Sequence, residues 1–276
     1  MTQRIWVLTR FLIERTLFSL TGVLYVILAL VYWRILFPVE QGTPDIDNYF
    51  LIIGAFGAVM AFIVTLTTAS RANEAANYPL IVRLPSRVEF LTAVLLSGLL
   101  VTGMLQLLVA LLALIRGPDL FSVRALDIPP VWLATNILTA VLAVHASDFV
   151  TRGWSRVTIY GILAIFLFGQ SSSSSLAPWF AQRLNSLSVT LINHSWVSTA
   201  GLVNRLISWL NGDGVTTLGN VLGFVFWPFR AILEAVINGS FDSNQALAPA
   251  VMLLYATILF MLAADLFANK DLDFIE

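Results

Sequence analysis

The chain has 276 residues, of which 58% are hydrophobic and 11% are charged, and its formal net charge is -1. Since an ordinary soluble domain carries about 25% charged residues, this composition indicates an integral membrane protein, and the balanced charge excludes a basic nucleic-acid-binding surface. The absence of cysteine excludes disulfides, thiol nucleophiles and cysteine metal sites.

The long apolar runs predict an all-α polytopic membrane protein in which residues 1–276 form a single transmembrane domain. We expect six transmembrane helices, an N-terminal interfacial helix, and amphipathic or re-entrant helices between the fifth and sixth spans. The predicted spans are residues 17–37, 49–69, 90–115, 131–150, 157–170 and 249–267.

Residues 1–16 place Arg4, Arg10 and Arg15 among apolar side chains. This pattern predicts a helix in the membrane interface, and a cytoplasmic lead-in to the first span is the alternative. The run 17–37 is longer than the ~7 to 15 apolar residues of a signal-peptide core. We therefore expect it to remain in the membrane as the first span.

A polar loop, residues 70–89, separates the second and third predicted spans. Its arginines favour the cytoplasmic side, because positively charged loops are retained there, and the resulting topology puts both chain ends in the cytoplasm. Pro79 and Pro85 interrupt any continuous helix. We expect a short helix over 71–77 and a new helix that Ser86 caps, with Glu89 three residues later.

Residues 171–248 form an outer segment without a simple span pattern. Apolar residues recur at helical spacing over 180–191 and again over 202–210, which predicts two amphipathic helices on the membrane surface. The run 218–237 is long enough to cross but contains Pro228. We favour two short re-entrant helices over a full crossing.

Motifs for catalysis are missing from the sequence. Lys270 is the one lysine, and Asp271 follows it, so the chain cannot carry a Walker-type nucleotide site. The histidines, His145 and His194, lie far apart, which makes a zinc site improbable. We therefore expect no catalytic, cofactor-binding or metal-ligating residue, and no enzymatic activity in this chain.

A few polar residues fall inside predicted spans. Ionisable groups within a membrane are candidates for ion or proton relays, whereas amides can simply join helices by hydrogen bonds. For His145 and Asp148 we favour a helix end at the interface, with Arg152 as the partner of Asp148, over a relay. The candidate polar path consists of Gln106, Asn136, His145 and Asp148.

The stretch from Leu80 to Leu91, which enters a long apolar helix after a proline, resembles the region after the second span of ABC-2 type ABC transporter permeases. Arg71 and Glu74 resemble the charged start of that region. The segments 228–239 and 265–272 are similar to the family's membrane-entering segment and last span. By this resemblance, the loop that contacts the ATPase contains Arg71, Glu74, Arg83, Leu84, Pro85, Ser86, Arg87 and Glu89.

The resemblance implies a permease subunit that exports or flips a substrate across a prokaryotic cell membrane. The partners it implies are ABC ATPase subunits, which bind ATP and Mg²⁺, a second permease copy or a sister permease, and membrane lipid. Nucleic acid is not an expected partner. Two alternatives from the residues stay open, an ion-coupled secondary transporter and a non-transporting membrane scaffold.

Overall fold

The computed structural model describes residues 2–37, 46–74, 77–115, 128–150, 161, 181–209, 212, 227–238 and 242–269. These residues are helical apart from short turns, and no strand occurs among them. The chain divides into two compact units, one formed by residues 1–159 with 231–276 and the other by residues 160–230.

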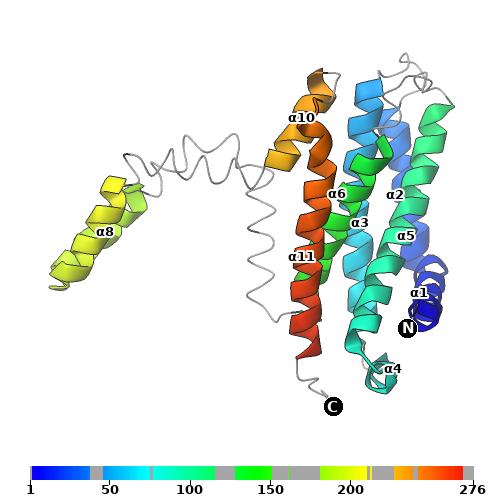
Figure 1. Cartoon of the computed structure of the whole chain (residues 1–276), viewed down its shortest axis with the longest axis horizontal. Helices are drawn as coiled ribbons and strands as arrows, with labels where there is room; N and C mark the ends of the chain where they lie inside the picture. The colour runs from blue at the N-terminus through cyan, green and yellow to red at the C-terminus, as the bar shows by residue number, and fades with distance from the viewer. Residues whose placement is uncertain are drawn as a thin grey trace. The chain divides into compact units, whose positions relative to one another are not determined.

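Most of the long helices of the first unit run alongside one another (Figure 1). Their bounds are α1 Thr2–Leu17, α2 Leu20–Leu36, α3 Ile46–Ala72, α4 Tyr78–Arg83, α5 Arg87–Leu114, α6 Ile128–Ala146, α10 Trp227–Asn238, the short 3₁₀ helix η4 Gln245–Leu247 and α11 Ala248–Ala268. The helix α10 begins just before the boundary between the units.

Four helical segments in the described part of the chain are long and apolar enough to cross a membrane, namely α3, α5, α6 and Gln245–Ala268. The pair α1 and α2 passes the same test together, but the two helices are bent by 72° at their junction. Four or five of the six predicted spans are therefore supported, and the chain is an all-α membrane protein. The predicted span 157–170 lies outside the described residues except for position 161.

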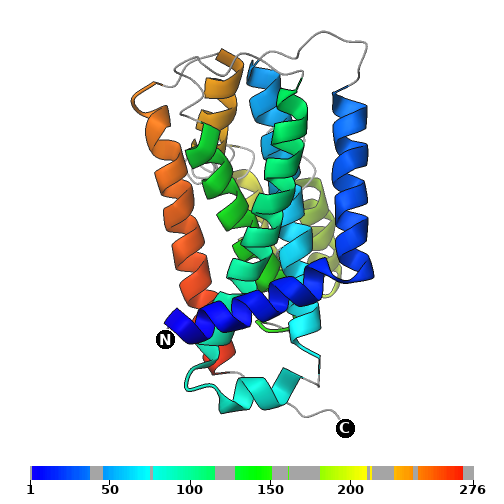
Figure 2. The same cartoon turned by 90° about the vertical axis from the view of Figure 1, so that its right-hand side faces the viewer.

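The junction between α1 and α2 explains why the first predicted span starts too early. Ser19 has an extended backbone, and its hydroxyl accepts a hydrogen bond from the Gly22 amide, so it caps a new helix at Leu20. A Cβ at Gly22 would collide with the carbonyl oxygens of Thr16 and Leu17, so the sharp turn depends on glycine. The helix α1 consequently crosses the bundle instead of extending α2 (Figure 2).

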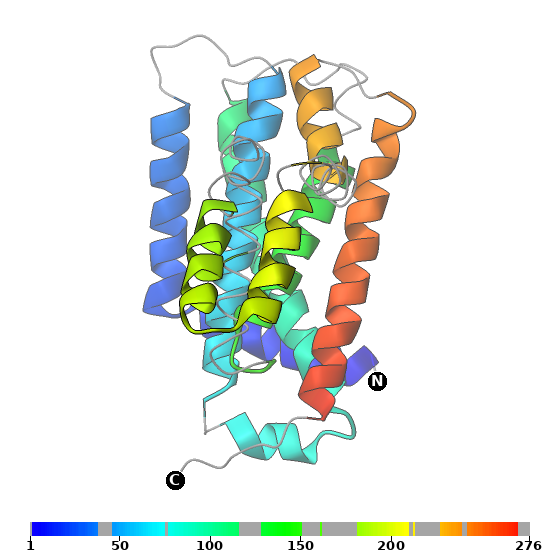
Figure 3. The ribbon, with the colours of Figure 1, turned by 90° about the vertical axis from the view of Figure 1, so that its left-hand side faces the viewer.

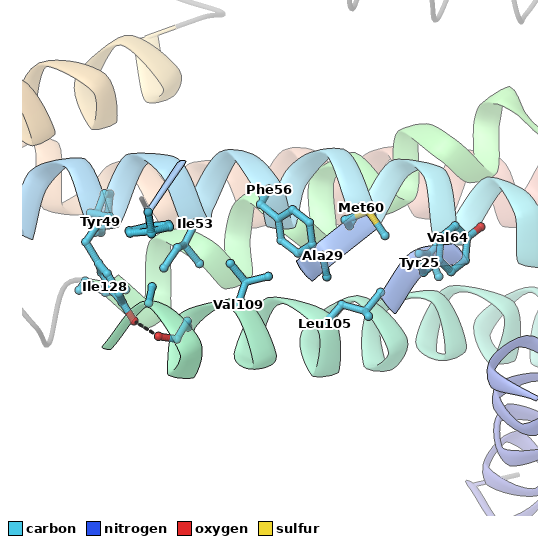
Figure 4. Close-up of a cluster of buried hydrophobic side chains, with 14 of the residues drawn as sticks. Tyr25, Ala29, Tyr49, Ile53, Phe56, Met60, Val64, Leu105, Val109 and Ile128 are labelled. Carbon is cyan, nitrogen blue, oxygen red and sulfur yellow. Dashed lines mark hydrogen bonds between the residues drawn. The ribbon is translucent and has the colours of Figure 1, made fainter. Parts of the chain in front are cut away.

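The helix α3 lies at the centre of the first unit and packs against α5 and α6. Side chains from α3 and α5 interdigitate in the apolar core (Figure 4). Gly54 of α3 contacts the Trp132 ring of α6, so this small residue lets the two helices approach each other closely. The Trp132 indole also donates a 3.0 Å hydrogen bond to the Phe50 carbonyl. The core includes Tyr25, Ala29, Ile53, Phe56, Met60, Val64, Val101, Leu105 and Val109.

The second unit contains a helix over residues 181–193 and the helix α8, Val197–Trp209 (Figure 3). Ser195 makes the turn between them with a φ of 66°, and Ser188 Oγ donates a 2.7 Å hydrogen bond to Asn204 Oδ1 across the pair. The two predicted helices are thus present. The predicted re-entrant segment is described only from Trp227, where α10 begins with Pro228 in its first turn.

Candidate functional site

The loop 70–89 is built differently from its prediction. The helix α3 continues through Arg71 to Ala72, and the short helix α4 begins only at Tyr78. The predicted helix over 71–77 is therefore wrong. Pro79 fits the first turn of α4 because the amides there need no partner within the helix. The predicted cap is present, since Ser86 Oγ accepts a 3.3 Å hydrogen bond from the Val88 amide.

Arg71 points from the end of α3 toward the turn between α1 and α2. Its Nη1 donates to Ser19 Oγ at 2.8 Å and to the Arg15 carbonyl at 3.4 Å. Its Nη2 donates to Thr21 Oγ1 at 2.5 Å. A planar guanidinium can make all these bonds at once. Arg71 therefore fastens α3 to the α1–α2 turn.

A second contact joins the same two regions. Arg15 Nη2 lies 2.5 Å from Glu74 Oε2, and Arg15 Nη1 donates to Asn77 Oδ1 at 3.3 Å. The buried Asn77 in turn donates from Nδ2 to the Arg71 carbonyl at 2.8 Å. Because the ion pair is partly exposed, it contributes only about 0–1 kcal/mol. We call Arg15, Ser19, Thr21, Arg71, Glu74 and Asn77 the brace.

The helix α4 lies at the end of the bundle, beyond α1 (Figure 2). Ile81 is only 1% exposed and anchors α4, whereas Leu80 is 41% and Val82 60% exposed. Arg83 and Pro85 are exposed too, and Leu84 is half-buried. The outer face of α4 therefore combines apolar side chains with a cationic one.

The remaining predicted contact residues lie at the start of α5. Ser86 and Arg87 are half-buried, but Glu89 is only 5% exposed, and its Oε2 has no hydrogen-bond partner among the residues that the structure describes. The N-terminal end of α5 favours a negative charge at this position. Glu89 is thus an interior residue of the bundle and is not part of the loop's outer surface.

An aromatic cluster fixes this end of the bundle. The Phe90 and Phe149 rings meet edge to face with centroids 5.9 Å apart, and Phe149 meets Phe267 in the same way at 5.0 Å. These contacts join the start of α5 to the end of α11 through the turn after α6. The sequence does not predict this cluster, because no local pattern shows which helix ends are neighbours.

The structure brings together the first two residues of the candidate polar path. Gln106 Nε2 donates to the Ile53 carbonyl at 3.1 Å, and Asn136 Nδ2 donates to Gln106 Oε1 at 2.6 Å. Gly57 makes the space for this pair, since a Cβ there would overlap the Gln106 carboxamide. The two amides therefore join α3, α5 and α6.

His145 and Asp148 lie apart from that pair. His145 is nine residues beyond Asn136 on α6, which is about 13 Å along the helix axis. His145 Nε2 lies 2.8 Å from the Leu259 carbonyl, so the ring joins α6 to α11. Asp148 is half-buried in the turn that follows α6.

Within the described ranges, no group of three or more His, Asp or Glu side chains is arranged to hold a metal ion. No protein-family model matches the chain, and no curated protein or solved structure matches it either. The features of the described residues that bear on function are the α4 surface, the brace and the polar groups of the interior.

Proposed function

We propose that this chain is the transmembrane permease subunit of an ABC-2 type ABC transporter. In this proposal it exports or flips a substrate across the plasma membrane of a prokaryotic cell, and a separate ATPase subunit binds ATP and Mg²⁺. A second copy of the chain or a sister permease completes the transporter. The end of the bundle that carries α1 and α4 faces the cytoplasm.

The observation that carries this proposal is the outer face of α4. Leu80 and Val82 are exposed beside Arg83 on a helix that Ile81 holds in place. Exposed apolar residues with a cationic neighbour are typical of a protein interface. We do not expect this face to contact lipid, because α4 belongs to a loop rich in charged residues and lies beyond the end of the bundle.

The brace supports a mechanical role for the loop. Arg71 and Arg15 connect the region before α4 to the α1–α2 turn, while Ser86 caps the long helix α5 directly after it. A partner that moves α4 therefore acts on α1, α2, α3 and α5 at once. ATP-driven closure of the ATPase would reach the bundle through these contacts.

The test is co-purification of the chain with an ATPase subunit encoded beside it, followed by ATPase and transport assays in liposomes. We expect Arg83→Glu and Val82→Asp to abolish the stimulation of ATPase activity and transport. The matched control is Arg4→Glu, which reverses an exposed charge on α1. Unchanged ATPase stimulation and transport in Arg83→Glu would refute the proposal.

A secondary transporter is the second candidate, and the buried Glu89 favours it. A carboxyl group inside a membrane bundle is a typical proton-binding group of such transporters. Transport by the purified chain alone, driven by a proton gradient and abolished in Glu89→Gln, would select this function. A fixed partner without any transport would instead select a scaffold role.

A further inference from the structure

Several threonines in the described helices of the first unit donate their hydroxyl to a carbonyl one turn earlier in their own helix, which is the usual way for a membrane helix to satisfy a hydroxyl. Thr67, Thr92, Thr135, Thr139 and Thr257 do this at 2.7 to 2.9 Å.

Thr65, Thr68 and Thr102 behave differently. Their side chains are fully buried, and their Oγ1 atoms have no hydrogen-bond partner in the part of the chain that the structure describes. Asn136 Oδ1 shares this condition, although the Asn136 amide nitrogen is bonded to Gln106. Unpaired buried polar atoms thus gather on α3, α5 and α6.

Thr65 lies at the interface between α3 and α5, Thr68 follows it by three residues on nearly the same face of α3, and Asn136 adjoins the interface through Gln106. Gly57 of α3 contacts Gln106 of α5, and eight residues further along α3, Thr65 contacts Gly98 of α5. Eight residues forward on α3 thus correspond to eight residues back on α5, so the two helices are antiparallel. Ala61, midway between Gly57 and Thr65, therefore lies opposite Thr102, midway between Gln106 and Gly98. We call this interface the seam; it consists of Gly57, Ala61, Thr65 and Thr68 on α3, Gly98, Thr102 and Gln106 on α5, and Asn136 on α6.

Dry packing leaves the seam in an unfavourable state. A buried hydroxyl or amide oxygen without a partner loses the hydrogen bonds that it makes in water, and lipid chains cannot replace them. None of the seam residues is ionisable, so nothing in the seam compensates the charge of a bare ion. Water satisfies neutral donors and acceptors without any charge, and buried water commonly makes about three such bonds.

We propose that the seam binds ordered water, so that the bundle has a hydrated polar path between α3, α5 and α6. The neighbouring core is apolar, because Val64 (Figure 4) and Val101, which adjoin Thr65 and Thr102 in sequence, both belong to the hydrophobic cluster. Water therefore follows the threonine faces of α3 and α5 and not their valine faces.

The absence of native cysteine allows a direct test by thiol labelling of the purified full chain in detergent or liposomes. The test variants are Thr65→Cys and Thr102→Cys, and their controls are Val64→Cys and Val101→Cys, four positions that are all 0% exposed. The probe is 2-aminoethyl methanethiosulfonate, which reacts with the thiolate. Thiolates form in water and not in apolar packing, so we expect labelling about tenfold or more faster at the threonine positions.

Labelling rates that are equal within each pair would overturn the proposal. A second measurement does not depend on reagent access, namely the midpoint of thermal unfolding of Thr102→Val, a replacement of nearly the same shape. A hydrated seam loses a water-mediated hydrogen bond in this variant, so the midpoint falls. A dry seam loses an unpaired hydroxyl instead, so a raised midpoint would overturn the proposal.

Thr135→Val is the control for the second measurement, because the Thr135 hydroxyl is bonded to the Val131 carbonyl of its own helix. Both measurements use the chain without an ATPase. If both measurements contradict a hydrated seam, that proposal is refuted, and the proposed permease function is unaffected.

Discussion

Arg71 Nη1 donates a 2.8 Å hydrogen bond to Ser19 Oγ, the same oxygen that caps α2. The last turn of α3 is thereby bonded to the first turn of α2, across 52 positions of the sequence. Any displacement of the loop after α3 therefore changes the forces on the α1–α2 turn.

Replacing Arg71 should loosen this connection. Arg71→Ala removes the bonds to Ser19, Thr21 and the Arg15 carbonyl, and hydrogen bonds to charged groups contribute about 1.5–3 kcal/mol. We expect a lower unfolding midpoint in detergent. Arg71→Lys should recover only part of the loss, because an ammonium cannot reproduce the planar fork. Full recovery by lysine would contradict the geometry described for the guanidinium.

Ile81 should determine whether α4 is held in place. Its side chain is 1% exposed on a helix of six residues, and an Ile→Ala change in a packed site costs about 2–5 kcal/mol. Ile81→Ala should detach α4 while the spans stay folded. Hydrogen exchange of the α4 amides should accelerate strongly, with slow exchange retained in α5. The neighbouring exposed position supplies the control, Val82→Ala, which should leave the exchange of α4 nearly unchanged.

Gly57 and Gly103 should respond in opposite directions to the same substitution. A Cβ at Gly57 would overlap the Gln106 carboxamide, whereas a Cβ at Gly103 meets nothing within 4 Å. Overpacking costs about 1–3 kcal/mol, and alanine exceeds glycine in helix propensity by about 1 kcal/mol. Gly57→Ala should therefore lower the unfolding midpoint, and Gly103→Ala should keep or raise it. A stabilised Gly57→Ala variant would show that the Gln106 site has unused space.

Removing the cap of α5 should lower the unfolding midpoint less than the substitutions above. Ser86 Oγ accepts the bond from the Val88 amide, and replacing such a serine by alanine costs about 1 kcal/mol. Ser86→Ala should thus lower the unfolding midpoint slightly and fray the first turn of α5, as seen by faster exchange of the Val88 amide. Ser86→Asp, which retains an acceptor, should preserve the slow exchange.

The length of the apolar runs predicted most of the bundle. The observed helices α3, α5, α6 and α11 agree with predicted spans to within a few residues, because an apolar run of about 20 residues can satisfy its backbone in lipid only as a helix. The cap at Ser86 was also predictable, since a serine after a proline and before an apolar run is a local signal.

Short-range patterns failed where two parts of the chain meet. Nothing near Arg71 in sequence indicates that its side chain turns toward Ser19, or that the α1–α2 junction bends by 72°. Glu89 likewise belongs by sequence to a charged loop, yet the packing of neighbouring helices buries it.

The sequence by itself determined that this is a helical membrane protein, because composition and span length are properties of single segments. Only the tertiary structure decided which polar groups form the brace, which face of α4 is exposed, and which buried threonines have no hydrogen-bond partner among the described residues. Hydrogen bonds and burial between helices depend on register and crossing, and both are set by contacts between residues far apart in the chain.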